Sequence, residues 1–410
     1  MAALVAFGAI GAPHPPGPTP SGAPSGPTPG HSIPAESPSP QPAAGPANEF
    51  RGVWVTTVAN LDFPSKPGLS VAELKAETDK ILDNTREMGF DAIFLQVRPE
   101  SDAFYPSEIF PWSRFLTGEQ GKAPPGGFDP LQYFIEGAHA RGLELHAWVN
   151  PLRAAFNALY RDAIAPGNPA ALNPGWVKWE GGGAVYDPGL PEVRALVLDG
   201  IRELCGLYEI DGVHFDDYFY PQGGIDDAAS HAAHGGGIPL DDWRRANINT
   251  LIREAQQAVR EARPGARFGV SPRAIWQNAD TDPRGSGTNG NPTYSSDFAD
   301  TLLWVQEGWM DYIVPQIYWE IGHPLADYQT LLEWWAAAVR DTGVDLYIGQ
   351  ATWLSYGETG TAWEGSGEIK RQIALNRAAP EVKGSLHFRY ALIAGNEGLR
   401  QVVKELNLAD

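Results

Sequence analysis

Apolar and polar positions change their period repeatedly from residue 51 to the end of the chain. Short apolar runs typical of buried strands alternate with longer segments whose apolar positions recur every three to four residues, as in amphipathic helices. Eight strand-like runs occur, over residues 51–58, 90–97, 144–150, 212–217, 267–271, 312–319, 346–351 and 385–390. Helical spacing is found over residues 71–88, 130–141, 191–208, 240–262, 328–341 and 367–376.

This alternation predicts parallel strands, and eight repeats predict a closed (β/α)8 TIM barrel, which is an α/β fold. An open doubly wound sheet is the alternative. No glycine-rich dinucleotide-binding loop follows the first strand, which disfavours it. We expect the barrel domain to span residues 49–410.

The first 48 residues do not share this pattern. Residues 1–12 hold a short apolar run that resembles the remnant of a signal peptide, although no Lys or Arg precedes it. Residues 13–48 consist mostly of Pro, Gly, Ala, Ser and Thr and are expected to form a disordered tether. These features predict a secreted or cell-envelope protein, and no later stretch has the roughly 20 apolar residues of a membrane span.

The fourth strand-like run ends on two adjacent acids, Asp216 and Asp217. Burial of an unpaired carboxylate is costly, so the two acids favour the barrel mouth, where barrel enzymes hold their active sites. Because side chains alternate along a strand, Asp216 is expected to face the barrel axis and Asp217 the rim. Glu320, at the end of the sixth run, is expected to supply a third carboxylate from across the barrel.

The same alternation turns further polar side chains toward the axis. Polar residues converging on one end of a barrel favour a binding pocket over a structural core. Arginines there can orient carboxylates or hydroxyls, and aromatic rings can stack on sugars, although the arginines can also be ion-pair partners and each ring can be packing. The expected substrate-binding residues are Arg98, His146, Trp148, Asn150, Arg153, His214, Tyr218, Gln316, Tyr318, Trp319, Trp353 and Arg389.

Carboxylates on both sides of a bond are what glycoside hydrolysis requires, so Asp216, Asp217 and Glu320 are predicted to be catalytic. Which acid is the proton donor stays open, and Asp217 can instead support Asp216. A metal site is the rival interpretation, and its possible ligands are His146, His214, His323, Asp216 and Asp217. No His-x-His pair ends the first run and no His-Glu-x-x-His motif occurs, so we expect neither a metal nor a cofactor.

Composition narrows the class of partner. A formal net charge of -20 disfavours nucleic acid and anionic membrane surfaces. Fourteen tryptophans are consistent with a polysaccharide substrate, although more than half are expected to be packing. We expect a monomer. A catalytically silent carbohydrate-binding barrel and a metal-dependent polysaccharide hydrolase or deacetylase are the alternatives to a glycosidase.

Five motifs, in order along the chain, resemble the glycosyl hydrolase-like family 10 proteins. They are Arg51-Gly52-Val53-Trp54-Val55, Gln96-Val97-Arg98-Pro99, His146-Ala147-Trp148-Val149-Asn150-Pro151, the segment from Asp211 to Tyr218, and Pro315-Gln316-Ile317-Tyr318-Trp319. The resemblance covers about residues 50–395. It implies an exported bacterial barrel glycosidase that acts on peptidoglycan glycan strands, with Asp216 and Asp217 as the strand-four acids and Glu320 near the strand-six motif.

Overall fold

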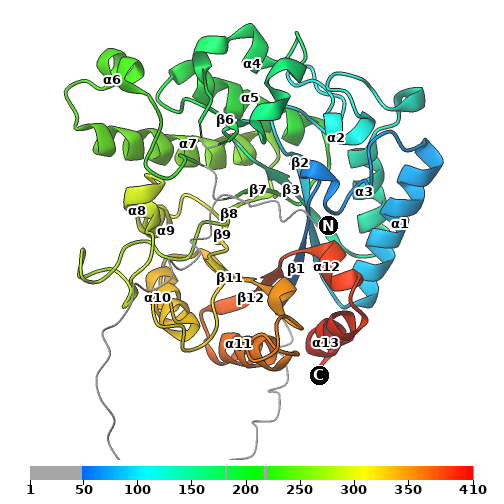
Figure 1. Cartoon of the computed structure of the whole chain (residues 1–410), viewed down its shortest axis with the longest axis vertical. Helices are drawn as coiled ribbons and strands as arrows, with labels where there is room; N and C mark the ends of the chain where they lie inside the picture. The colour runs from blue at the N-terminus through cyan, green and yellow to red at the C-terminus, as the bar shows by residue number, and fades with distance from the viewer. Residues whose placement is uncertain (1–48, 181, 217–218, 410) are drawn as a thin grey trace, which may run out of the picture. The chain divides into compact units, whose positions relative to one another are not determined.

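Parallel strands close into an eight-stranded barrel with helices around it, which confirms the predicted (β/α)8 fold (Figure 1). The computed structural model describes residues 49–180, 182–216 and 219–409. The barrel strands are β1 (Phe50–Val55), β2 (Ala92–Arg98), β3 (Glu144–Val149), β7 (Gly212–Phe215), β8 (Arg267–Val270), β9 (Tyr312–Ile313), β10 (Gln316–Ile317), β11 (Asp345–Gln350) and β12 (Val382–His387).

The sixth barrel position is one strand in two pieces. Val314 and Pro315 separate β9 from β10, since proline has no N–H to give to a ladder. Strand β11 pairs with both pieces, Asp345 with Tyr312 and Gln316 with Gly349, so the barrel still closes.

Each helix predicted between the strands is present. They are α1 (Val71–Glu87), α3 (Pro130–His139), α5 (Pro191–Leu207), α7 (Leu240–Ala262), α10 (Tyr328–Val339) and α11 (Gly367–Ala378). Helix α1 begins with a capping box, in which Ser70 and Glu73 satisfy each other's backbone N–H groups. At the start of α3 the side chain of Asp129 accepts the backbone N–H of Gln132, and Pro130 takes the first helical position.

Several elements were not predicted. They include the helices α13 (Glu397–Leu408), α9 (Thr301–Gln306) and α12 (Tyr390–Ala394), and helix α6 (Ala228–His234) in the loop after β7. A separate antiparallel sheet of order β4-β6-β5 follows β3, built from Arg153–Ala155, Ala184–Tyr186 and Val177–Lys178. Strands of two or three residues are too short to leave a periodic pattern. No helix in the described ranges is both long and apolar enough to cross a membrane.

An aromatic layer fills the barrel interior. Its members, contributed by successive strands, are Trp54, Phe94, Trp148, Tyr312, Tyr347 and Leu386, with Ala92 and Val314. Two strand glycines make room for it: a Cβ on Gly212 would collide with the ring of His146, and one on Gly269 with the ring of Tyr312. Glycine is therefore required at these positions by close packing.

Candidate functional site

Asp216 lies one residue beyond β7 and is the centre of the site. Its carboxylate oxygen Oδ2 accepts a hydrogen bond from Trp148 Nε1 at 3.2 Å and another from Asn150 Nδ2. Both donors come from the end of β3, which pairs with β7 in parallel register. The structure therefore brings together Asp216, Trp148 and Asn150 on the inward face, as strand alternation predicts. Two N–H donors on one oxygen stabilise the charged form of a carboxylate.

Asn150 is held in turn by β2. Gln96 Nε2 donates to Asn150 Oδ1 at 2.7 Å, and both side chains are fully buried. Gln96 lies on an inward position of β2, opposite Trp148, and is not among the predicted site residues.

Below Asp216, two histidines form a buried hydrogen-bonded layer. Trp54 Nε1 lies 3.3 Å from His214 Nε2, and an indole N–H can only donate, so Nε2 is an acceptor and Nδ1 carries the proton. That proton points to the Tyr312 hydroxyl at 3.3 Å, and the hydroxyl lies 2.9 Å from His146 Nδ1. His146 Nε2 then donates to the Glu144 carboxylate at 3.1 Å.

Neither histidine of this layer is exposed to a substrate. Both are fully buried, and burial lowers the pKa of each, for His214 to well below its usual range, with the nearby His146 as a second cause. They are therefore neutral members of the barrel core. This burial is at odds with the expectation that His146 and His214 contact substrate, and His214 Nε2 lies 3.0 Å from Ser271 Oγ.

Glu320 follows β10 and is half-buried. Its backbone carbonyl accepts from the N–H groups of His323 and Tyr328, which fixes the turn after β10. Within the part of the chain that the structure describes, the Glu320 carboxylate has neither a hydrogen-bond partner nor an ion-pair partner. A partly exposed carboxylate in this state can form a hydrogen bond with a bound molecule.

Three partly exposed rings form an aromatic wall, defined here as Tyr318, Trp353 and Phe388. Tyr318 meets Trp353 edge to face at 4.8 Å between ring centroids, and Trp353 meets Phe388 at 5.4 Å. The three rings follow β10, β11 and β12, which are neighbours in the barrel. Phe388 lies 6.0 Å from Trp54, so the wall borders the layer beneath Asp216. Tyr318 and Trp353 are placed as predicted; Phe388 was missed.

Arg98 does not face the mouth, contrary to the prediction. The register between β2 and β3 shifts between Gln96 and Arg98, so a bulge inserts one residue and reverses the side on which Arg98 lies. Its guanidinium stacks on Phe110 at 3.7 Å, and it packs where a Cβ on Gly200 of α5 would lie. Arg98 is therefore a packing residue behind the barrel wall.

Arg153 and Arg389 are also held inside the protein. Arg153 Nη1 donates to the carbonyl of Pro99 at 3.1 Å. Arg389 forms an ion pair of 2.6 Å with the buried Asp62 and donates to the carbonyl of Leu61. Both contacts tie loops together, and that of Arg389 is the ion-pair alternative noted for the arginines.

Of the remaining candidates, the structure describes Gln316 and Trp319. Gln316 Nε2 donates to the carbonyl of Ser271 at 2.9 Å and is partly exposed. Trp319 is partly exposed, with its ring 6.3 Å from that of His323. Asp217 and Tyr218 lie outside the described residues, so their predicted roles stay predictions.

Two buried acids lie in the loop after β2. Glu100 binds Arg114 at 3.2 Å and accepts the backbone N–H of Phe156, and Asp102 accepts from Gln120. Burial, followed by the charge of Asp102, raises the pKa of Glu100 to about 7. The pair joins the loops after β2 and β3.

Trp54, Gln96 and Tyr312 are the main residues that the sequence interpretation missed. Each lies on an inward position of its strand, so the same alternation that found Trp148 could have found them. Tyr312 and Trp54 were overlooked because aromatic residues in a strand look like ordinary core.

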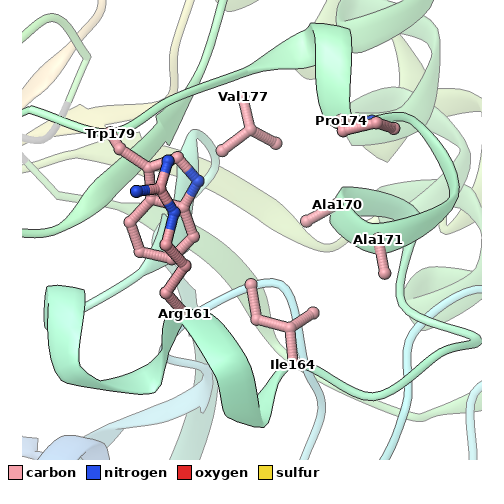
Figure 2. Close-up of a pocket in the computed structure, with 7 residues that line it drawn as sticks. All are labelled: Arg161, Ile164, Ala170, Ala171, Pro174, Val177 and Trp179. Atoms are coloured by element: carbon pink, nitrogen blue, oxygen red, sulfur yellow. The ribbon is translucent and has the colours of Figure 1, made fainter.

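A shallow pocket of about 180 Å³ lies in the segment that follows β3 (Figure 2). The guanidinium of Arg161 stacks on the ring of Trp179 at 4.8 Å on one side, and Ile164, Ala170 and Val177 line the rest. None of the predicted site residues lines it. Among the residues that are described, no group of three His, Cys, Asp or Glu side chains is arranged to hold a metal ion.

Comparison with known proteins adds independent information. A family model described as glycosyl hydrolase-like 10 matches residues 49–355. Glycosyl hydrolase YngK of Bacillus subtilis (strain 168) is 45% identical over 347 residues, which is 83% of this chain and 68% of that protein. Glycosyl hydrolase DigH of Escherichia coli (strain K12) is 37% identical over 388 residues, covering 87% of this chain and 86% of that protein.

Among solved structures, the PgaB (BpsB) glycoside hydrolase domain from Bordetella bronchiseptica is similar with a TM-score of 0.57. The match covers 87% of this chain and 98% of that domain at 14% sequence identity. At this identity the likeness concerns the barrel fold.

Proposed function

Because the chain belongs to the glycosyl hydrolase-like 10 family, we propose that it is a glycoside hydrolase that cleaves an amino-sugar polymer, the glycan strands of bacterial peptidoglycan. The observation that carries the proposal is Asp216 at the end of β7, with two N–H donors on its Oδ2. The five motifs that resemble the family support the choice of polymer.

In this proposal Asp216 acts in its charged form, as nucleophile or as the base that activates water, because its donors stabilise the carboxylate. Glu320 protonates the leaving glycosidic oxygen. The partly exposed aromatic wall of Tyr318, Trp353 and Phe388 offers apolar ring faces to sugar units. Asp217 remains a candidate that supports Asp216.

The two acids can be told apart by the leaving group. An aryl glycoside whose phenolate departs easily needs little protonation, so Glu320→Gln should hydrolyse it nearly as fast as wild type while losing activity on natural glycans. Asp216→Asn should lose activity on both substrates. Equal losses of Glu320→Gln on both substrates would remove Glu320 from the role of proton donor.

The polymer is tested by mass spectrometry of products from peptide-free peptidoglycan strands, chitin-type chains and poly-N-acetylglucosamine. We expect new, shorter oligosaccharides from the peptidoglycan strands first. Saturable binding without new reducing ends would instead support a silent carbohydrate-binding barrel. Loss of activity with a chelator, together with a bound divalent ion, would support a metal-dependent hydrolase.

We propose further that the protein works outside the cytoplasm, where such a polymer lies. The apolar run of residues 1–12 and the Pro-rich residues 13–48 support this location. Cell fractionation with an antibody against the barrel tests it, and recovery with the cytoplasmic proteins would contradict it.

A further inference from the structure

We propose that Gln96 is a positioning residue that sets the direction of the hydrogen bond from Asn150 to Asp216. The inference rests on the proposed function in one respect, because it takes Asp216 as the catalytic carboxylate. The geometry that supports it is a chain of three amide contacts that begins at the backbone after β1 and ends at Asp216.

The first contact fixes Gln96 itself. Its Oε1 accepts the backbone N–H groups of Thr57 and Val58, each at 2.9 Å. A backbone N–H can only donate, so this end of the amide must be the oxygen. The Gln96 backbone carbonyl also accepts from Thr57 Oγ1 at 2.7 Å, which ties the turn after β1 to β2. The NH2 end of Gln96 therefore points to β3.

The second contact fixes Asn150. Because the NH2 of Gln96 donates to Asn150 Oδ1 at 2.7 Å, the Asn150 amide must present its own NH2 on the other side. On that side lies Asp216 Oδ2, which accepts it. A carboxylate only accepts, so the reverse orientation would set two oxygens against each other. An asparagine amide has nearly the same shape in both orientations, so the choice depends on its hydrogen-bond partners.

Gln96 thus acts through Asn150 rather than on a substrate. It is fully buried and has no exposed atom to offer a ligand. Its anchors are backbone groups, which no side-chain movement can withdraw. A carboxylate held by such a chain keeps one position during the reaction. Residues that support metal ligands act in the same indirect way, and their loss typically costs about 10- to 100-fold in activity.

The direct test is Gln96→Glu, which preserves size and the acceptor for Thr57 and Val58 but removes the donor to Asn150. We expect kcat on the proposed glycan to fall by about 10- to 100-fold at neutral pH with KM changed less than about twofold. Protonation of the new carboxyl restores an O–H donor, so the variant to wild-type ratio of kcat should rise as pH falls. A ratio that does not change with pH would overturn the proposal.

Gln350→Glu is the matched control. Gln350 is also fully buried on a barrel strand, but its Nε2 donates to the Tyr328 hydroxyl of α10, away from Asp216. We expect a similar loss of thermal stability and no pH-dependent recovery of kcat. In an Asn150→Ala background, Gln96→Glu should have little further effect, because its route to Asp216 is gone. If Gln96→Glu lowered kcat by the same factor in the Asn150→Ala background as in wild type, action through Asn150 would be contradicted.

A measurement without turnover separates this inference from the proposed function. Carbon-13 NMR of the Asp216 carboxyl should show a changed chemical shift in Gln96→Glu at neutral pH that returns to the wild-type value as the introduced carboxyl is protonated, and no such change in Gln350→Glu. If wild type cleaves no glycan but this difference appears, the positioning role stands and the glycosidase proposal falls. If wild type cleaves glycan and Gln96→Glu matches it in kcat and titration, the positioning role falls alone.

Discussion

At the residue scale, the indole of Trp148 is a direct donor to Asp216. Trp148→Phe keeps an aromatic ring in the barrel layer and removes this donor. A hydrogen bond to a charged group contributes about 1.5 to 3 kcal/mol, so we expect a loss in kcat of at least about tenfold on the cleaved glycan. Steady-state kinetics measure it.

Trp304→Phe is the control for Trp148→Phe. Trp304 is equally buried but donates to Asn249 in the helix layer outside the barrel. The Trp304→Phe variant should have a lower free energy of unfolding than wild type and an unchanged kcat. A loss of kcat as large as that of Trp148→Phe would show that the effect is structural.

Glu100 makes stability depend on pH. Burial and the nearby Asp102 raise the pKa of Glu100 to about 7, above its ordinary value of 4.5, so the folded state holds this proton more tightly than the unfolded state does. The contribution of Glu100 to the free energy of unfolding should therefore be largest below about pH 4.5 and should fall as pH rises to about 7.

Glu100→Gln isolates that contribution. Between about pH 5 and about pH 7, the free energy of unfolding should fall less in the variant than in wild type. Urea unfolding at pH values about one unit apart measures it. Parallel curves for the two proteins would contradict the raised pKa. The amide still can accept from Phe156, so gross unfolding is not expected.

The position of Asp216 could be predicted from residues alone, because a strand that ends on an acid has few structural reasons to do so. The histidines could not be placed this way. A polar residue on the axis can lie at the mouth or in the layer beneath it, and alternation does not give depth. His146 and His214 lie in the lower layer, where Trp54, Tyr312 and Glu144 satisfy their nitrogens.

At the element scale, Gly212 tests the packing of β7 on β3. A Cβ there would collide with the ring of His146, so Gly212→Ala should lower the melting temperature by several degrees, corresponding to about 1 to 3 kcal/mol. Gly206→Ala in α5 meets nothing within 4 Å and should stabilise the protein, since alanine favours helix. Calorimetry compares them; equal melting temperatures would contradict this packing.

The aromatic wall gives a prediction about the polymer. Trp353→Ala removes its central ring, and an aromatic contact contributes about 0.5 to 1.5 kcal/mol. KM for a long glycan should therefore rise by about 2- to 13-fold, with a smaller change in kcat. Trp309→Ala, on a partly exposed ring before β9, is the control. An unchanged KM in Trp353→Ala would mean that the wall does not hold sugar.

Strand alternation was reliable where a strand is regular and failed where it is not. In β2 the bulge before Arg98 turned that side chain toward α5, and a sequence shows no mark of one inserted residue. In β12 both faces are buried from Gly384 to His387, so the sequence pattern does not show which face is inward. Leu386 belongs to the inner layer, whereas His387 lies on the other face, where it bonds Thr352 and packs on Phe90.

At the scale of the whole molecule, the repeated strand and helix pattern determines the barrel, because only a few ways exist to bury eight strands between helices. The sheet of β4, β5 and β6 and the ion pair of Arg389 with Asp62 depend on contacts between distant residues, which no local pattern encodes. The barrel brings Asp216 and its donors together from strands that are far apart in sequence.

The proposed function has Asp216 carry out glycan cleavage at the mouth of this barrel. Its most direct test is mass spectrometry of peptide-free peptidoglycan strands incubated with wild type, Asp216→Asn and the exposed control Asp341→Asn at the turn after α10. We predict shorter oligosaccharides with wild type and the control, and a rate reduced by roughly 10²- to 10⁴-fold or more with Asp216→Asn. Equal product formation by Asp216→Asn and wild type would contradict the account.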